Sequence, residues 1–228
     1  MNENLGEFRG KITITDGAWG TQLQAKGLQA GECPDVWNIE NPLAVETVAR
    51  AYIEAGSEII LTNTFRSNRL VLEHWGLADA AQELARRGAE ISRKVAGDSA
   101  AVFGSMGPTG KIVMMGQTPP DEIQSSFADQ AAALERGGAQ AILCETFAEL
   151  DELLLALRAA RENTKLPVIV SMTFDSGPDK TSTMMGNTPD DLVSAAIDAG
   201  AAAVGANCGT GPENYVKPVS YTHLTLPT

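Results

Sequence analysis

Short apolar runs rich in Val, Ile and Ala alternate along this chain with longer segments of helical hydrophobic period. The short runs lack the period-two alternation of a half-buried strand, which predicts strands buried on both faces, as in a parallel sheet. Six such strands are expected, at residues 11–15, 58–62, 101–104, 139–144, 167–172 and 201–206.

The segments between these runs predict five helices. In the first, Val45, Val48 and Tyr52 share one face, Pro42 provides the start and Gly56 the end. The others are expected over about 77–96, after Pro119-Pro120-Asp121, and over about 150–163 and 189–199. Strands and helices that alternate in this way form repeated βαβ units, so the sequence predicts an α/β fold with a parallel sheet.

The strand ends distinguish two α/β architectures. A doubly wound sheet gathers its functional groups at one switch point, whereas a (β/α)₈ TIM barrel receives them from the ends of all its strands. Here nearly every predicted strand ends in polar or glycine residues, and the first turn, DGAWGT at 16–21, lacks the GxGxxG pattern of dinucleotide-binding folds. These observations favour the barrel. The strand ends in question are Asp16-Gly17, Asn63-Thr64, Gly104-Ser105, Glu145-Thr146, Thr173 and Asn207-Cys208.

Only six of the eight βα units of a barrel are expected, so we predict an incomplete TIM barrel over residues 1–218. Residues 219–228 have no βα character, and their opening VSYTHL resembles a reading frame through the adapter of a sequencing library. We therefore expect this tail to be non-native. A natural but poorly ordered terminus is the alternative.

Composition excludes several classes of partner. The net charge of -12 argues against nucleic acid and against anionic membrane surfaces, which both reward clustered Lys and Arg. No apolar run approaches the ~18 residues of a membrane span, and the acidic start differs from a signal peptide. Three cysteines are too few and too scattered for a disulfide framework, so a cytoplasmic location is expected.

Cys208 is the most informative candidate for chemistry. It follows the strand at 201–206, between Asn207 and Gly209, where a thiolate is well placed to hold a metal or attack a substrate. The alternative is a small buried hydrophobe, which is the usual role of a free cysteine. The residues around Cys208 leave both interpretations open.

Six short motifs at successive strand ends resemble those of the zinc-dependent homocysteine S-methyltransferases, and the resemblance runs from about residue 12 to 216. The module that opens cobalamin-dependent methionine synthase is the most similar variant, judging by NTF and GPTG. The motifs are DGAWGT at 16–21, ILTNTF at 60–65, GSMGPTG at 104–110, ETF at 145–147, SMTF at 171–174 and GANCG at 205–209.

The resemblance implies a metal site and a reaction. The family holds Zn²⁺ with three cysteines, of which Cys208 matches one, and the adjacent pair that supplies the other two has no counterpart in this chain. Zinc keeps a bound thiol deprotonated and nucleophilic, which suits transfer of a methyl group to homocysteine to give methionine. The donor is of the methylcobalamin, methylfolate, S-methylmethionine or betaine type, with cobalamin on another module. The fragment itself is expected to be inactive.

Further residues follow from the same motifs. Asp16 and Glu145 are expected to receive the homocysteine ammonium, and Asn207 to order the metal ligand or the amino acid. The turn from Gly17 to Gly20, Ala18 included, offers backbone N–H groups to the substrate carboxylate. Asn63, Thr64 and Ser105 are substrate-binding candidates that serve equally well as turn or cap residues, and Asp16 also suits a turn before glycine.

Two other functions remain open at this level. A lyase or aldolase-like barrel would use a Schiff-base lysine at a strand end, but Lys11 and Lys165 lie at or before strand starts and Lys111 lies in a loop. A non-catalytic fragment that binds the amino acid weakly is the second alternative.

Overall fold

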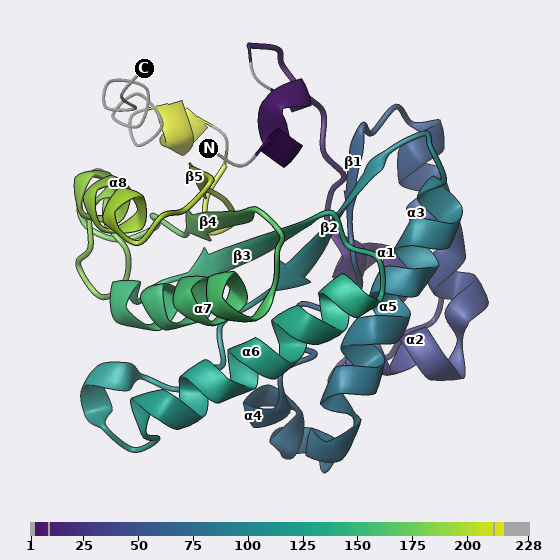
Figure 1. Ribbon diagram of the computed structural model, residues 1–228, viewed down its shortest axis with the longest axis horizontal. Helices are drawn as coiled ribbons and strands as arrows, with labels where there is room; N and C mark the ends of the chain where they lie inside the picture. Colours follow the sequence, from purple (N-terminus) through teal and green to yellow (C-terminus); the bar gives the residue numbers. More distant parts are fainter. Residues whose placement is uncertain (1–2, 9, 212, 217–228) are drawn as a thin grey trace.

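The computed structural model of this chain describes residues 3–8, 10–211 and 213–216 (Figure 1). Its centre is one sheet of five parallel strands that lie side by side in their order along the chain. The strands are β1 (Ile59–Leu61), β2 (Ala101–Met106), β3 (Ala141–Phe147), β4 (Val168–Met172) and β5 (Ala203–Ala206).

All five predicted helices are present, and shorter helices that the hydrophobic pattern did not predict join them. The predicted ones are α3 (Pro42–Glu54), α5 (Ala81–Ala96), α6 (Pro120–Arg136), α7 (Leu150–Asn163) and α8 (Pro189–Asp198). The others are α1 (Trp19–Gln24), α2 (Trp37–Glu40), α4 (Arg69–Leu72), and the 3₁₀ turns η1 (Glu3–Phe8), η2 (Pro34–Val36), η3 (Glu73–Trp75), η4 (Ala78–Ala80) and η5 (Val113–Met115).

The order of the strands confirms the prediction of barrel architecture. A doubly wound sheet reverses its strand order at a switch point, whereas β1 to β5 run in sequence order without reversal. Helices α5, α6 and α7 lie along the sheet in succession (Figure 1). The larger core forms where α6 and α7 pack on β2, β3 and β4, around Phe127, Phe147 and Leu157.

The opposite face of the strands forms a smaller apolar cluster. Ile59, Phe103 and Ala141 face it, and Leu5 and Phe8 from η1 pack against them. The rings of Phe8 and Phe103 meet edge to face with centroids 5.8 Å apart. Because both faces of the strands are covered, the sheet shows the continuous apolar runs that the sequence displays.

The first predicted strand, 11–15, is shorter than expected. Thr15 makes a single parallel bridge to Ile59, and backbone hydrogen bonds join Ile14 and Asp16 to the start of β1. The Ile12 and Ile14 side chains are 94% and 60% exposed. A β-branched run favours a strand only where neighbours pack on it, and these side chains lack such neighbours among the residues described.

The remaining expectations concern the far end of the sheet. Within the described part of the chain, β5 pairs with β4 alone, as the prediction of an incomplete barrel requires. The predicted tail at 219–228 lies outside the described residues. In the described ranges no helix is long and apolar enough to cross a membrane.

Candidate functional site

Four of the predicted site residues meet where β2, β3 and β5 end. The Ser105 hydroxyl donates to Oε1 of Glu145. Oε2 of the same carboxylate lies 3.3 Å from Nδ2 of Asn207, which also lies 3.3 Å from the sulfur of Cys208. Carboxylate and thiol therefore belong to one hydrogen-bonded cluster, although their residues lie far apart in sequence.

Asn207 is the centre of this cluster. Its Oδ1 accepts from the backbone N–H of Thr146 at 3.0 Å and from the hydroxyl of Ser171 at 2.7 Å. Those two bonds fix which end of the amide carries the nitrogen, so Nδ2 faces Glu145, Cys208 and, at 2.8 Å, Oγ1 of Thr146. That Asn207 orders the metal ligand or the amino acid stays a prediction, for which its position between Glu145 and Cys208 is suitable.

Asp16 is held beside β1 by hydrogen bonds to only one of its two carboxylate oxygens. Its Oδ2 accepts from Nε1 of Trp19 and from the backbone N–H of Leu61, each at 2.7 Å, while the buried Oδ1 has no partner among the residues that the structure describes. Burial raises the pKa of Asp16 to about 6. A buried carboxylate with a free oxygen is poised to accept a hydrogen bond from a ligand.

Glu145 shares this electrostatic environment. Burial raises the pKa of its carboxyl group, the hydrogen bond from Ser105 lowers it, and the negative charge of Asp16 raises it again. The two carboxylates are thus close enough to repel each other. A cation placed between them would relieve that repulsion and restore both charged forms.

The glycine turn after Asp16 leads into the short helix α1. Ala18 is the residue before that helix, and its carbonyl oxygen accepts from the hydroxyl of Tyr52 at 3.1 Å. A Cβ at Gly17 would lie 3.1 Å from the same hydroxyl, so a glycine suits this position. Binding of the substrate carboxylate by residues 17–20 stays a prediction.

Asn63 and Thr64 have their side chains in other networks. Nδ2 of Asn63 donates to the Pro34 carbonyl at 2.8 Å and to Oδ1 of Asn38 at 3.0 Å. The Thr64 hydroxyl donates to the backbone carbonyl of Ser105 at 2.8 Å. Both side chains are buried, so the geometry favours the alternative that they are structural residues beneath the site.

The three cysteines differ in environment. Cys208 is exposed, which excludes the interpretation of a small buried hydrophobe for this residue. Cys33 and Cys144 are buried, and burial raises the pKa of each to about 12. No three His, Cys, Asp or Glu side chains in the described ranges are grouped so as to hold a metal ion. These residues alone therefore do not form a complete zinc site.

Sequence reasoning missed three contributors to the cluster. Thr146 and Ser171 bond to Asn207, and the Tyr215 hydroxyl donates to the carbonyl oxygens of Asn207, at 2.9 Å, and of Cys208. Thr146 and Ser171 lie in the motifs ETF and SMTF, so their positions at strand ends were visible. Which of their atoms would meet Asn207 depends on the three-dimensional arrangement.

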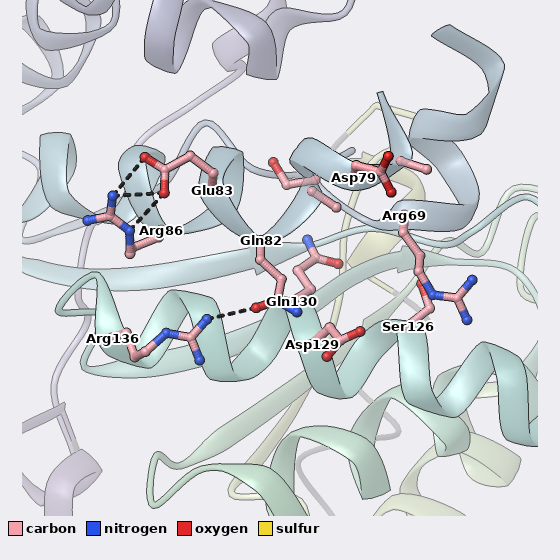
Figure 2. A pocket seen from close by; sticks show the side chains of 12 residues that line it. Arg69, Asp79, Gln82, Glu83, Arg86, Ser126, Asp129, Gln130 and Arg136 are labelled. Carbon is pink, nitrogen blue, oxygen red and sulfur yellow. Dashed lines mark hydrogen bonds and ion pairs between the residues drawn. The ribbon is translucent and has the colours of Figure 1, made fainter. Parts of the chain in front are cut away.

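A separate cavity of about 520 Å³ lies in the helical layer, beside α4, α5 and α6 (Figure 2). Its charged groups are of both signs: Arg86 pairs with Glu83, and Arg136 donates to Oε1 of the uncharged Gln82 at 3.1 Å. None of the predicted site residues lines it. The volume of this cavity does not by itself indicate a ligand or a reaction.

The fold and the site together define a (β/α) barrel protein with a carboxylate pair and an exposed thiol at the carboxyl ends of its strands. The family model for homocysteine S-methyltransferase matches residues 13–227 of this chain. The chain belongs to that family, which confirms the resemblance seen in the strand-end motifs.

Individual relatives agree. The chain is 32% identical over 220 residues to methionine synthase of Mycobacterium leprae and 33% identical to that of Mycobacterium tuberculosis, with 89% of this chain covered in each case. It spans only 18% of the length of those relatives. Among solved structures, the metallated form of the homocysteine methyltransferase MmuM from Escherichia coli superimposes with a TM-score of 0.81 at 21% identity, over 97% of this chain and 83% of that one. This last likeness shows the fold.

Proposed function

We propose that this chain binds homocysteine and serves the transfer of a methyl group to its thiol, giving methionine. The observation that carries the proposal is the cluster in which Asn207 joins the Glu145 carboxylate to the Cys208 sulfur. Such a cluster suits a substrate with an ammonium group at one end and a sulfur at the other. Family membership and the methionine synthase relatives support the same reaction.

The amino-acid end of homocysteine lies between Asp16 and Glu145 in this proposal. The unpaired Oδ1 of Asp16 accepts from the ammonium, and the positive charge relieves the repulsion between the two carboxylates. Ser105 holds one oxygen of Glu145, which keeps the carboxylate oriented before the substrate arrives. The backbone N–H groups of residues 17–20 receive the substrate carboxylate.

The sulfur end points toward Cys208. We infer that Cys208 is one ligand of a zinc ion whose other protein ligands lie outside the described residues. An exposed sulfur with an amide donor beside it, at the end of a strand, is suited to ligation. One thiolate does not make a zinc site.

The methyl donor is of the methylcobalamin, methylfolate, S-methylmethionine or betaine type. The methionine synthase relatives favour the first two, which would be carried by other parts of a longer polypeptide. The donor binds opposite the homocysteine sulfur, so that the sulfur attacks the methyl carbon as the bond to the donor breaks.

The test uses the natural protein that carries this chain. Methionine formation from homocysteine is measured by mass spectrometry with each of the four donors in turn, and zinc content is measured in parallel. We expect one donor to support turnover, and Cys208→Ser to lose both zinc and activity. A protein that forms no methionine with any donor and does not bind homocysteine in calorimetry would contradict the proposal.

A further inference from the structure

The end of β3 departs from regular strand geometry. Its pairing with β4 matches Cys144 to Val170 and then Phe147 to Met172, so three steps along β3 correspond to two along β4. The extra residue makes a β-bulge at Glu145 and Thr146. Within it, Thr146 has a φ of 67°, in the left-handed region that β-branched residues rarely adopt.

The bulge turns two consecutive side chains toward the same amide. In a regular strand neighbouring side chains point to opposite faces, yet Glu145 Oε2 and Thr146 Oγ1 both lie within hydrogen-bond distance of Nδ2 of Asn207, at 3.3 and 2.8 Å. Glycine or asparagine would adopt this backbone with less strain. A threonine at a strained position points to a use for its hydroxyl.

That hydroxyl contacts the sulfur of Cys208. Because Oγ1 of Thr146 accepts from Asn207, its own hydrogen is free to be donated, and Cys208 Sγ lies 3.6 Å away. The Cys208 backbone is also left-handed, with a φ of 61°. Two strained strand ends therefore meet through one O–H···S contact.

We propose that Thr146 is a positioning residue, whose hydroxyl holds the sulfur of Cys208 in the orientation that methyl transfer requires. The role of the Cys208 sulfur in methyl transfer rests on the proposed function. The contact between Thr146 and that sulfur is a feature of the structure and does not depend on the proposed function. The contact restrains the direction in which the exposed sulfur points. Removal of the hydroxyl should therefore let the sulfur turn away from its reactive orientation and slow its reaction with an electrophile, whereas a hydroxyl that only packs against the loop would leave the rate unchanged or raise it.

The experiment measures the rate at which iodoacetamide alkylates the full chain at pH 7.5. Cys33 and Cys144 are buried, and Cys208→Ser gives their background rate. Thr146→Val removes the hydroxyl and keeps the shape, and we expect a rate about threefold lower, which is within the range expected for the loss of one weak hydrogen bond. Thr146→Ser keeps the hydroxyl and should react like the natural chain.

Two further variants control for packing. Thr173→Val also removes one threonine hydroxyl from this region, but that hydroxyl bonds to the Asn207 carbonyl at 3.0 Å and not to sulfur, so the alkylation rate should stay unchanged. Thr146→Gly relieves the left-handed strain, so it should unfold at a higher denaturant concentration and still react slowly. Thr146→Ala replaces the valine variant if that variant does not fold.

A Thr146→Val rate equal to or above that of the natural chain would overturn the proposal, as would a serine variant as slow as the valine variant. In the natural protein, Thr146→Val should lower kcat for methionine formation by a similar factor and leave the KM for homocysteine near its original value. Failure of the alkylation test refutes the role of Thr146 alone. Absence of homocysteine binding in the natural protein refutes the proposed function and leaves the alkylation result standing.

Discussion

The side-chain amide of Asn207 donates to the carboxylate of Glu145 across 3.3 Å, although the residues are 62 positions apart. This bond joins the end of β3 to the end of β5 over the strand between them. The residue proposed to bind the substrate ammonium is thereby coupled to the neighbour of the proposed metal ligand. Substrate binding by Glu145 and the reactivity of Cys208 can be measured separately.

Glu145→Gln should weaken homocysteine binding by about 10- to 100-fold, the range expected when a charged hydrogen bond is lost. The chain should stay folded, because the amide fills the same space and removes a buried charge. Calorimetric titration of homocysteine into the natural protein measures the change. Glu122→Gln, which affects only a partly exposed ion pair with Arg69, should bind homocysteine as before. Equal affinity of the Glu145 variant and the natural protein would exclude Glu145 from the ammonium site.

Asp16 should make stability depend on pH. Its pKa in the folded chain is about 6, against 3.8 for an aspartate side chain free in solution. Because the folded state holds the proton more tightly, the favourable contribution of Asp16 is complete below about pH 4 and is lost as the pH rises through 6. Asp16→Asn should therefore match the natural chain near pH 4 and exceed its free energy of unfolding by at most about 3 kcal/mol at pH 7.5.

Urea denaturation at the two pH values measures this difference. Asp98→Asn, at an exposed position, should change the free energy of unfolding by the same small amount at both pH values. An Asp16→Asn variant that loses stability at pH 7.5 would mean that the Asp16 charge is stabilised by the fold. The same variant should also bind homocysteine less tightly, since the ammonium loses a charged partner.

The sequence predicted the architecture because hydrophobic period and strand-end polarity are local signals. Helix α7 was predicted with the bounds it has, and β2 to β5 differ from prediction by a few residues at their ends. The strand at 11–15 was predicted too long, since the exposure of Ile12 and Ile14 depends on what packs beside them. Burial by distant parts of the chain is not a local property.

The candidate site was predicted in part for the same reason. Asp16, Glu145 and Cys208 were identified by type and position. Glu145 and Cys208 belong to one cluster through Asn207, Asp16 lies close enough to affect the Glu145 carboxyl group, and their roles stay predictions. Asn63 has the same kind of position at a strand end, but its amide bonds to Asn38, in the separate short helix α2. Thr146 was overlooked because a bulge reverses the expected direction of its side chain, and strand periodicity contains no sign of a bulge.

The cysteines should differ sharply in reactivity. Cys33 and Cys144 are buried, and burial raises the pKa of each thiol to about 12, whereas Cys208 is exposed. Because the thiolate is the reacting form, a neutral disulfide reagent should label one thiol per chain in native buffer and three in denaturant. Cys208→Ser should reduce the native value to zero. Rapid labelling of a second thiol in the natural chain would show that the core opens around Cys33 or Cys144.

The last prediction concerns Gly88, where helix α5 approaches the end of β1. A Cβ at this position would lie 2.5 Å from Cγ2 of Thr64 and 2.7 Å from Nδ2 of Asn38. That amide donates to the carbonyl oxygens of Asn63, at 2.7 Å, and of Leu84, at 3.0 Å. Gly88→Ala would push the helix away from this network, which costs roughly 1–3 kcal/mol in well-packed interiors.

Alanine is also a better helix former than glycine, by about 1 kcal/mol, so the two effects oppose each other at residue 88. Gly20→Ala in α1 isolates the second effect, because an added Cβ there has nothing within 4 Å. We expect Gly20→Ala to raise the free energy of unfolding and Gly88→Ala to lower it, both measured by urea denaturation. If both variants are stabilised, the contact between α5 and the end of β1 is looser than described. The network of Asn38 and Asn63 beneath the site would then not depend on the glycine.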